Sequence, residues 1–90
     1  MNYYIDFLKM MEESNYIART YGFDNIVKWA DAALELGEMS YEMHQKCIRV
    51  RHLRNELAFD NGIGVNVSLE DYQIAQDLAT MIRDSAVRNK

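Results

Sequence analysis

The chain contains no proline and only one cysteine among its 90 residues. The absence of proline leaves every helical segment without its strongest breaker. Cys47 has no second cysteine with which to form an intramolecular disulfide, and the first residues lack the basic start and apolar run of a signal peptide. No stretch approaches the roughly 20 apolar residues that span a bilayer. We therefore expect a cytoplasmic protein without a membrane-spanning segment.

The composition, with 49% apolar and 27% charged residues, is typical of a globular protein, and we assign residues 1–90 to a single helical domain. Helical periodicity covers about 2–21, 24–37, 40–59 and 68–86. The intervening stretch before the last helix has a period of two and predicts a short irregular or extended loop. Four helices with short connections favour an all-α fold, an antiparallel four-helix bundle.

Residues at the segment ends support these boundaries. Gly22 and Gly37 are typical of helix C-termini, whereas Asp24, Ser40 and Ser68 are predicted N-caps. We expect the core to be formed by apolar stripes on the four segments. These stripes comprise Tyr3, Phe7, Met10, Met11, Ile17, Ala18, Tyr21, then Ile26, Trp29, Ala30, Ala33, Leu34, then Met43, Cys47, Val50, Leu53, Leu57, and finally Ala75, Leu78, Ala79, Ile82 and Ala86.

The basic residues are concentrated in the third segment, although the chain carries a net charge of −4. Arg54 falls between Cys47 and Leu57 within the apolar stripe of that segment, and Arg51 lies beside the stripe. A desolvated guanidinium needs acceptors, because an unpaired buried charge costs several kcal/mol. Two interpretations follow: a structural arginine bonded to an acid or a helix end, or a residue that forms a site.

At "RNELAF", residues 54–59, the chain resembles the HEPN superfamily, small helical-bundle domains found in toxin-antitoxin, CRISPR and other defence systems. The motif of that superfamily is an Arg, often followed by Asn, a few residues before a His on a late helix. In catalytic members the Arg and His line a cleft, usually between two domains, and support metal-independent RNA cleavage. The resemblance implies a HEPN-like bundle in which Arg54 and Asn55 are cleft residues.

The motif departs from the superfamily at Phe59, one of the positions where the His would stand. Phenylalanine cannot transfer a proton, so we predict no catalytic residue and a non-catalytic binding or interaction module. We add Arg51, His52 and Phe59 to Arg54 and Asn55 as binding candidates.

The resemblance implies a bacterial or phage defence or toxin-antitoxin setting, with a protein partner, a homodimer or RNA bound and no cofactor. Two alternatives stay open. The first is a ribonuclease in which another group replaces the missing His. The second is a small helical inhibitor or adaptor.

Acidic residues form a second pattern, on one face of the second segment. Asp24, Asp31, Glu35 and Glu38 lie within about 60° of one another at 100° per residue. Such a stripe increases solubility, and the alternative is a partner-facing surface for a basic macromolecule.

Two minor patterns complete the set of candidates. His44 and Cys47 lie one turn apart, but no second pair of ligands has matching spacing, so we predict no metal site and a core position for Cys47. Tyr4, Tyr16 and Tyr41 lie off the apolar stripes or near their edges, and are candidates for extending an interface.

Overall fold

The computed structural model describes residues 3–60 and 66–90, which form four α-helices and, within those ranges, no strand. The helices are α1 (Tyr4–Thr20), α2 (Ile26–Glu35), α3 (Tyr41–Asp60) and α4 (Leu69–Arg83). The all-α prediction is therefore confirmed. The extended character predicted before the last helix falls mainly on residues 61–65, which lie outside the described part of the chain.

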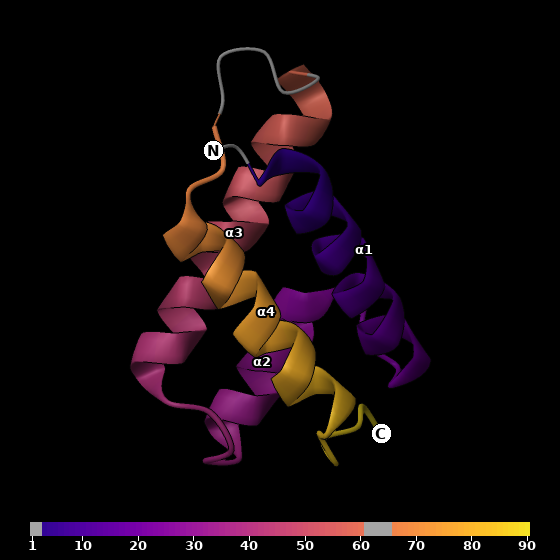
Figure 1. The fold of residues 1–90 in the computed structure, drawn as a ribbon. Helices are drawn as coiled ribbons and strands as arrows, with labels where there is room; N and C mark the ends of the chain where they lie inside the picture. Colours follow the sequence, from indigo (N-terminus) through magenta and orange to yellow (C-terminus); the bar gives the residue numbers. More distant parts are fainter. Residues whose placement is uncertain (1–2, 61–65) are drawn as a thin grey trace.

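Figure 1 shows how the helices are arranged. α1 and α4 lie side by side and run in the same direction, whereas α3 runs in the direction opposite to α4. The shorter α2 packs mainly against α3, to which it is joined by a short connection. None of the helices in the described ranges has the length and apolarity required to cross a bilayer.

The helix starts depend on side-chain caps, and one prediction is wrong. The N-cap of α2 is Asn25 rather than Asp24: the Asn25 Oδ1 accepts hydrogen bonds from the N–H groups of Val27 (2.9 Å) and Lys28 (3.1 Å). The exposed Asp24 stands one residue too early to reach those N–H groups.

The other two predicted caps are confirmed. The Ser40 Oγ accepts a hydrogen bond from the Met43 N–H at 3.0 Å, and the Ser68 Oγ accepts one from the Asp71 N–H at 3.1 Å. The Ser68 hydroxyl also lies 3.0 Å from the Asp71 carboxylate. A capping box would join that carboxylate to the backbone N–H of Ser68 instead, so the arrangement is a variant of the predicted one.

The core draws on all four helices and agrees with most of the predicted stripes. Two predictions are wrong. Leu34 is half-buried and lies outside the core cluster, and Ala86 lies exposed beyond α4, which ends at Arg83. The buried residues from the predicted stripes are Phe7, Met11, Ala18, Ile26, Trp29, Ala30, Ala33, Cys47, Val50, Leu57, Ala75, Leu78, Ala79 and Ile82.

The chain after α4 packs against the turn between α1 and α2. Asn89 donates hydrogen bonds to the carbonyl oxygens of Tyr21 (3.0 Å) and Gly22 (2.7 Å), and the guanidinium of Arg88 lies 3.5 Å from the centre of the Tyr21 ring. Gly22 has a φ of +93°, and a Cβ at this position would lie 3.2 Å from the Asn89 side chain. The glycine therefore provides both the left-handed turn and the space for this contact.

Candidate anion-binding cluster on α3

The first half of α3 carries basic side chains that are paired with acids. The buried His44 Nε2 lies 2.7 Å from the Asp31 Oδ1 on α2. Arg49 reaches α4, where its Nη2 lies 2.9 Å from the Oδ1 of the buried Asp71 and its Nη1 lies 3.7 Å from Glu70. These pairs join α3 to its two neighbours, which is a structural role.

The second half of α3 holds two arginines that converge on one neutral acceptor. The Arg51 Nε and the Arg54 Nη1 both donate to the Asn55 Oδ1, at 3.4 and 3.3 Å. Both side chains are half-buried, and no carboxylate in residues 3–59 or 66–90 forms an ion pair with either of them. The acid partner expected of a structural Arg54 is therefore not found in the described part of the chain.

Arg51, Arg54 and Asn55 form an arginine cluster. Its electrostatics are unfavourable when the protein binds no anion. Burial lowers the pKa of Arg51, and the positive charge of Arg54 lowers it further. The Arg54 Nε is buried and has no hydrogen-bond acceptor. One amide oxygen cannot neutralise two cations, so an anion that accepts hydrogen bonds from both guanidiniums would be stabilised here.

The chemistry that this cluster can supply is recognition of an anion. A guanidinium presents its N–H donors in a planar fork that matches the oxygens of a phosphate or a carboxylate. Arginine stays protonated near neutral pH and therefore cannot act as a general base there. The cluster fits a binding role.

The structure separates the other binding candidates from Arg54. His52 is exposed and lies 2.8 Å from Glu56 on its own helix. Phe59 is 85% exposed, five residues and therefore about 140° from Arg54 around the helix. Of the predicted binding residues, only Arg51, Arg54 and Asn55 come together.

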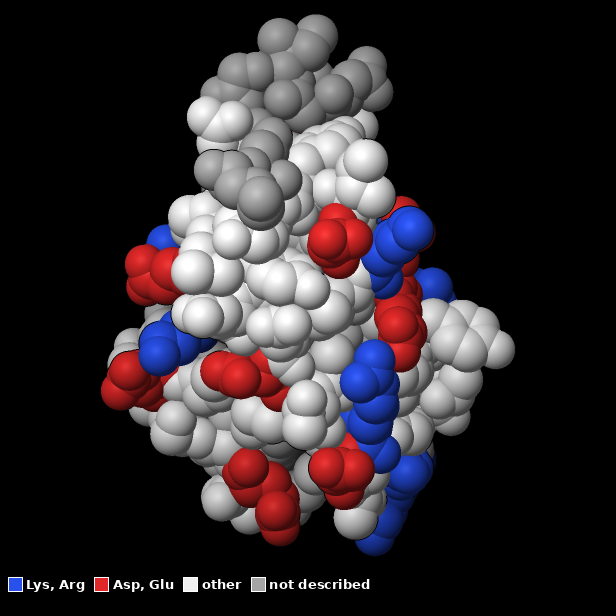
Figure 2. Space-filling view, in the orientation of Figure 1, with Lys and Arg blue, Asp and Glu red and all other residues white. Residues whose placement is uncertain are grey.

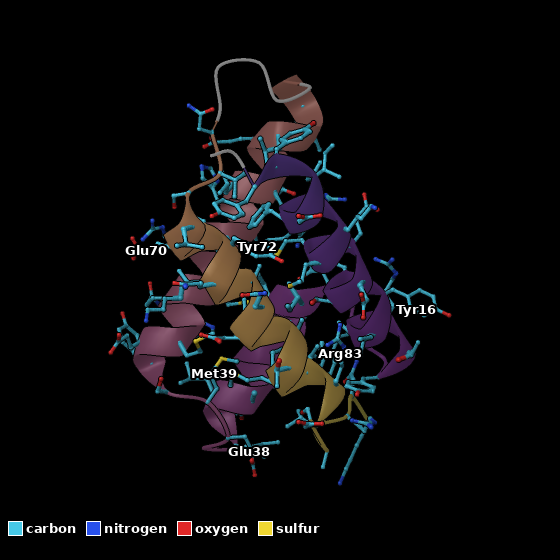
Figure 3. The ribbon with its side chains drawn as sticks, in the orientation of Figure 1. Tyr16, Glu38, Met39, Glu70, Tyr72 and Arg83 are labelled. Atoms are coloured by element: carbon cyan, nitrogen blue, oxygen red, sulfur yellow. The ribbon has the colours of Figure 1, made fainter. Side chains whose placement is uncertain are left out.

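The acidic stripe predicted on the second segment is not one continuous helix face. α2 spans Ile26–Glu35, so Asp24 precedes it and Glu38 follows it. Figure 3 shows Glu38 at the lower end of the molecule, beyond α2. The carboxylate of Asp31 is bonded to His44, which leaves it less available to a partner.

A shallow depression of about 320 Å³ lies beside α2, lined in part by Asp24, Asp31 and Glu35. Lys28 also lines it and offsets part of the negative charge. Over the face formed by α1 and α4, Figure 2 shows acidic and basic side chains interspersed rather than gathered by sign.

Cys47 is a core residue, as predicted. Its side chain is fully buried, and this burial, followed by the nearby charge of Asp31, raises the pKa of its thiol to about 12. The Nε2 of His44 is directed to Asp31. In the described ranges no three His, Cys, Asp or Glu side chains are grouped as metal ligands would be.

Sequence reasoning missed two polar contacts that join segments distant in the sequence. The buried Asn15 Oδ1 accepts a hydrogen bond from the Ile26 N–H at 2.9 Å, and the Trp29 Nε1 donates to the Ser85 Oγ at 3.0 Å. The available signal was the polar pair at positions 14 and 15, which interrupts the apolar stripe between Met11 and Ala18.

Comparison with protein-family models, with curated proteins and with solved structures finds no significant match for this chain. The resemblance to HEPN domains consequently rests on the residues of "RNELAF" alone, and the HEPN-like identity of the bundle stays a prediction.

Proposed function

We propose that the chain is a non-catalytic HEPN-like bundle that binds RNA through the arginine cluster of α3. The observation that carries the proposal is the convergence of Arg51 and Arg54 on the Asn55 Oδ1, with no carboxylate partner in the described ranges. Phosphate oxygens would replace the single weak acceptor with a full negative charge. A cytoplasmic defence or toxin-antitoxin setting is part of the proposal and is supported by the motif resemblance alone.

The net charge of −4 weakens long-range attraction to RNA but does not prevent contact at this site. α3 carries four lysines and arginines, Lys46, Arg49, Arg51 and Arg54, against the three acids Glu42, Glu56 and Asp60, and is therefore slightly basic. Binding that rests on phosphate contacts weakens steeply with added salt.

The residues at the motif support binding of RNA without its cleavage. Phe59 occupies a motif position of the catalytic His and cannot transfer a proton. His52 does not compensate, because it pairs with Glu56 and lies about 160° from Arg54 around the helix. A ribonuclease would need a proton-transfer group that these positions do not provide.

A titration of end-labelled RNA, read for binding and for cleavage in the same samples, tests the proposal. Arg51→Ala and Arg54→Ala should each weaken binding and reduce the slope of log K against log salt by about 0.7. Lys28→Ala is the matched control, because it removes an exposed cation from α2 and should leave the slope unchanged.

Phe59→His adds a test of the resemblance. If the position corresponds to that of the catalytic His, the variant should gain cleavage that is lost again on Arg54→Ala. Cleavage by the wild-type chain would refute the non-catalytic reading. Absence of salt-dependent binding by the wild-type chain would refute RNA binding and would favour a protein partner.

A further inference from the structure

The two guanidiniums of the arginine cluster lie closer together than their charges favour. Arg51 and Arg54 are three residues apart and are therefore neighbours on one face of α3, where like charges destabilise a helix. Their hydrogen bonds of 3.4 and 3.3 Å to one Asn55 Oδ1 limit the separation of the two donor nitrogens to 6.7 Å, the sum of the two distances. Two positive charges thus surround one point, and in residues 3–59 and 66–90 no carboxylate forms an ion pair with either.

Asn55 is a weak acceptor for both arginines. Its amide oxygen is neutral, and both bonds are longer than the ordinary range of about 2.7–3.2 Å. Arg54 lies about 100° from Asn55 around the helix, so its side chain has to bend sideways to reach that oxygen. The Arg54 Nε stays buried without an acceptor. A stronger acceptor in the place of the Oδ1 would therefore receive hydrogen bonds from both guanidiniums.

The charge of the cluster favours one kind of phosphate. A phosphodiester within an RNA strand carries a single negative charge. A phosphate monoester at the end of a strand carries a charge of about −1.5 to −2 near pH 7 and has three acceptor oxygens. Two guanidiniums that converge on one point match the monoester in charge and in the number of acceptors. Two arginines spaced along a strand would each meet a separate diester instead.

We propose that the arginine cluster binds the phosphate monoester at an end of an RNA strand. This inference rests on the proposed function and specifies which part of the RNA the cluster binds. The terminal phosphate takes the place of the Asn55 Oδ1 and accepts hydrogen bonds from Arg51 and Arg54. Both side chains are half-buried, and the end of a strand approaches them with less steric conflict than a strand that continues in two directions.

Fluorescence anisotropy with an RNA strand of about 12 nucleotides tests the inference. One sequence is prepared with a 5′-phosphate or a 3′-phosphate, with the fluorophore at the opposite end, and each form is compared with the same labelled strand without the phosphate. At least one phosphorylated form should bind about tenfold more tightly than its counterpart, because charge-assisted hydrogen bonds are gained. Inorganic phosphate, at an ionic strength held constant with chloride, should remove this advantage.

Variants of the cluster locate the phosphate. Arg51→Ala and Arg54→Ala should each remove most of the advantage. Asn55→Asp keeps the shape of the side chain and gives both arginines a carboxylate within the chain, so it should abolish the advantage and should not lower the melting temperature. Gln45→Glu is the matched control, because it changes the charge equally at an exposed position about 15 Å along α3 from Asn55. This variant should keep the advantage.

The outcomes separate the inference from the proposed function. If phosphorylated and unphosphorylated strands bind equally while Arg54→Ala weakens binding, recognition of the terminal phosphate is refuted and binding of internal phosphates by the cluster stands. An advantage that Asn55→Asp retains as fully as Gln45→Glu also refutes the inference. A lower melting temperature of Asn55→Asp would contradict an uncompensated positive charge at the Oδ1 and would refute it too. A wild-type chain that binds no RNA, with or without a terminal phosphate, refutes both proposals.

Discussion

The two halves of α3 use the same kind of side chain in different ways. In the first half, Arg49 forms an ion pair with the buried Asp71, and the pair joins α3 to α4. In the second half, Arg51 and Arg54 share the amide oxygen of Asn55 and have no carboxylate partner in the described ranges. The number of arginines in a segment therefore does not distinguish a structural cation from a binding cation. The presence or absence of a carboxylate opposite each arginine does.

The two halves of α3 should also differ in how much a substitution changes the free energy of unfolding. Removing Arg49 would leave the buried carboxylate of Asp71 without its partner, so the first half should be sensitive to substitution. In the described ranges the two arginines of the second half form no ion pair with a carboxylate, so removing one should cost the fold little. Such an arrangement is typical of sites that bind at the expense of stability.

The largest expected effect is in the paired half. Asp71→Ala should lower the free energy of unfolding by about 2 kcal/mol, because it removes the partner of Arg49 and an acceptor of the Ser68 hydroxyl. Urea denaturation followed by circular dichroism measures this loss. Glu70→Ala is the control, since its carboxylate lies 3.7 Å from Arg49 and is exposed. An equal loss in both variants would contradict the assignment of a structural role to Asp71.

Cys47, which lies in the first half of α3, provides a reporter with an effect of intermediate size per pH unit. Its folded pKa of about 12 exceeds the ordinary value of 9.0, so the unfolded chain loses the thiol proton first as the pH rises. The stability contribution is complete below pH 9.0 and is lost between pH 9.0 and about 12, by up to about 1.4 kcal/mol per pH unit.

Denaturation of the wild type and of Cys47→Ala at several alkaline pH values isolates this contribution from those of lysine and tyrosine. The free energy of unfolding should fall more steeply in the wild type. Parallel curves would show that the thiol ionises as readily in the folded state as in the unfolded state. In Arg51→Ala the fall should extend to higher pH than in the wild type, because the charge of Arg51 lowers the pKa of the thiol.

The smallest expected effect is in the unpaired half. Arg54→Met should change the free energy of unfolding by less than about 1 kcal/mol, and in the stabilising direction, because it removes a guanidinium whose Nε is buried without an acceptor. The apolar stem is retained, so the packing loss is small. Thermal melting compares this variant with Asp71→Ala. A loss as large as that of Asp71→Ala would make Arg54 a structural residue and remove the contrast between the two halves.

Sequence patterns predicted the helices and most of the core because their causes are local. The glycines at 22 and 37 adopt positive φ values as helix-ending residues do. Ser40 and Ser68 cap their helices through bonds to residues three positions away. The Asp24 prediction was wrong by a single residue, because Asp and Asn are adjacent and both are good N-caps, so only the backbone geometry selects Asn25.

The candidate site was predicted only in part. The pattern placed Arg54 on the apolar stripe and named Arg51 and Asn55, which the fold brings together. It also named His52 and Phe59, which lie elsewhere on the helix surface. His52 is two residues from Arg54 and Phe59 is five, and neither spacing returns to the same face of a helix. The exposure of Tyr41, Ile48 and Phe59 on α3 was not predicted as a unit, because exposure depends on which side of the helix the neighbours cover.

The sequence by itself determined the four helices, the caps at Ser40 and Ser68 and most of the apolar faces, since these depend on residues within one or two turns of each other. Only the tertiary structure decided which charges are paired. His44 meets Asp31 from α2, and Arg49 meets Asp71 from α4, across distances in sequence that no periodicity encodes. The physical reason is that an ion pair forms where two helices happen to face each other. The same packing leaves Arg51 and Arg54 beside a neutral amide.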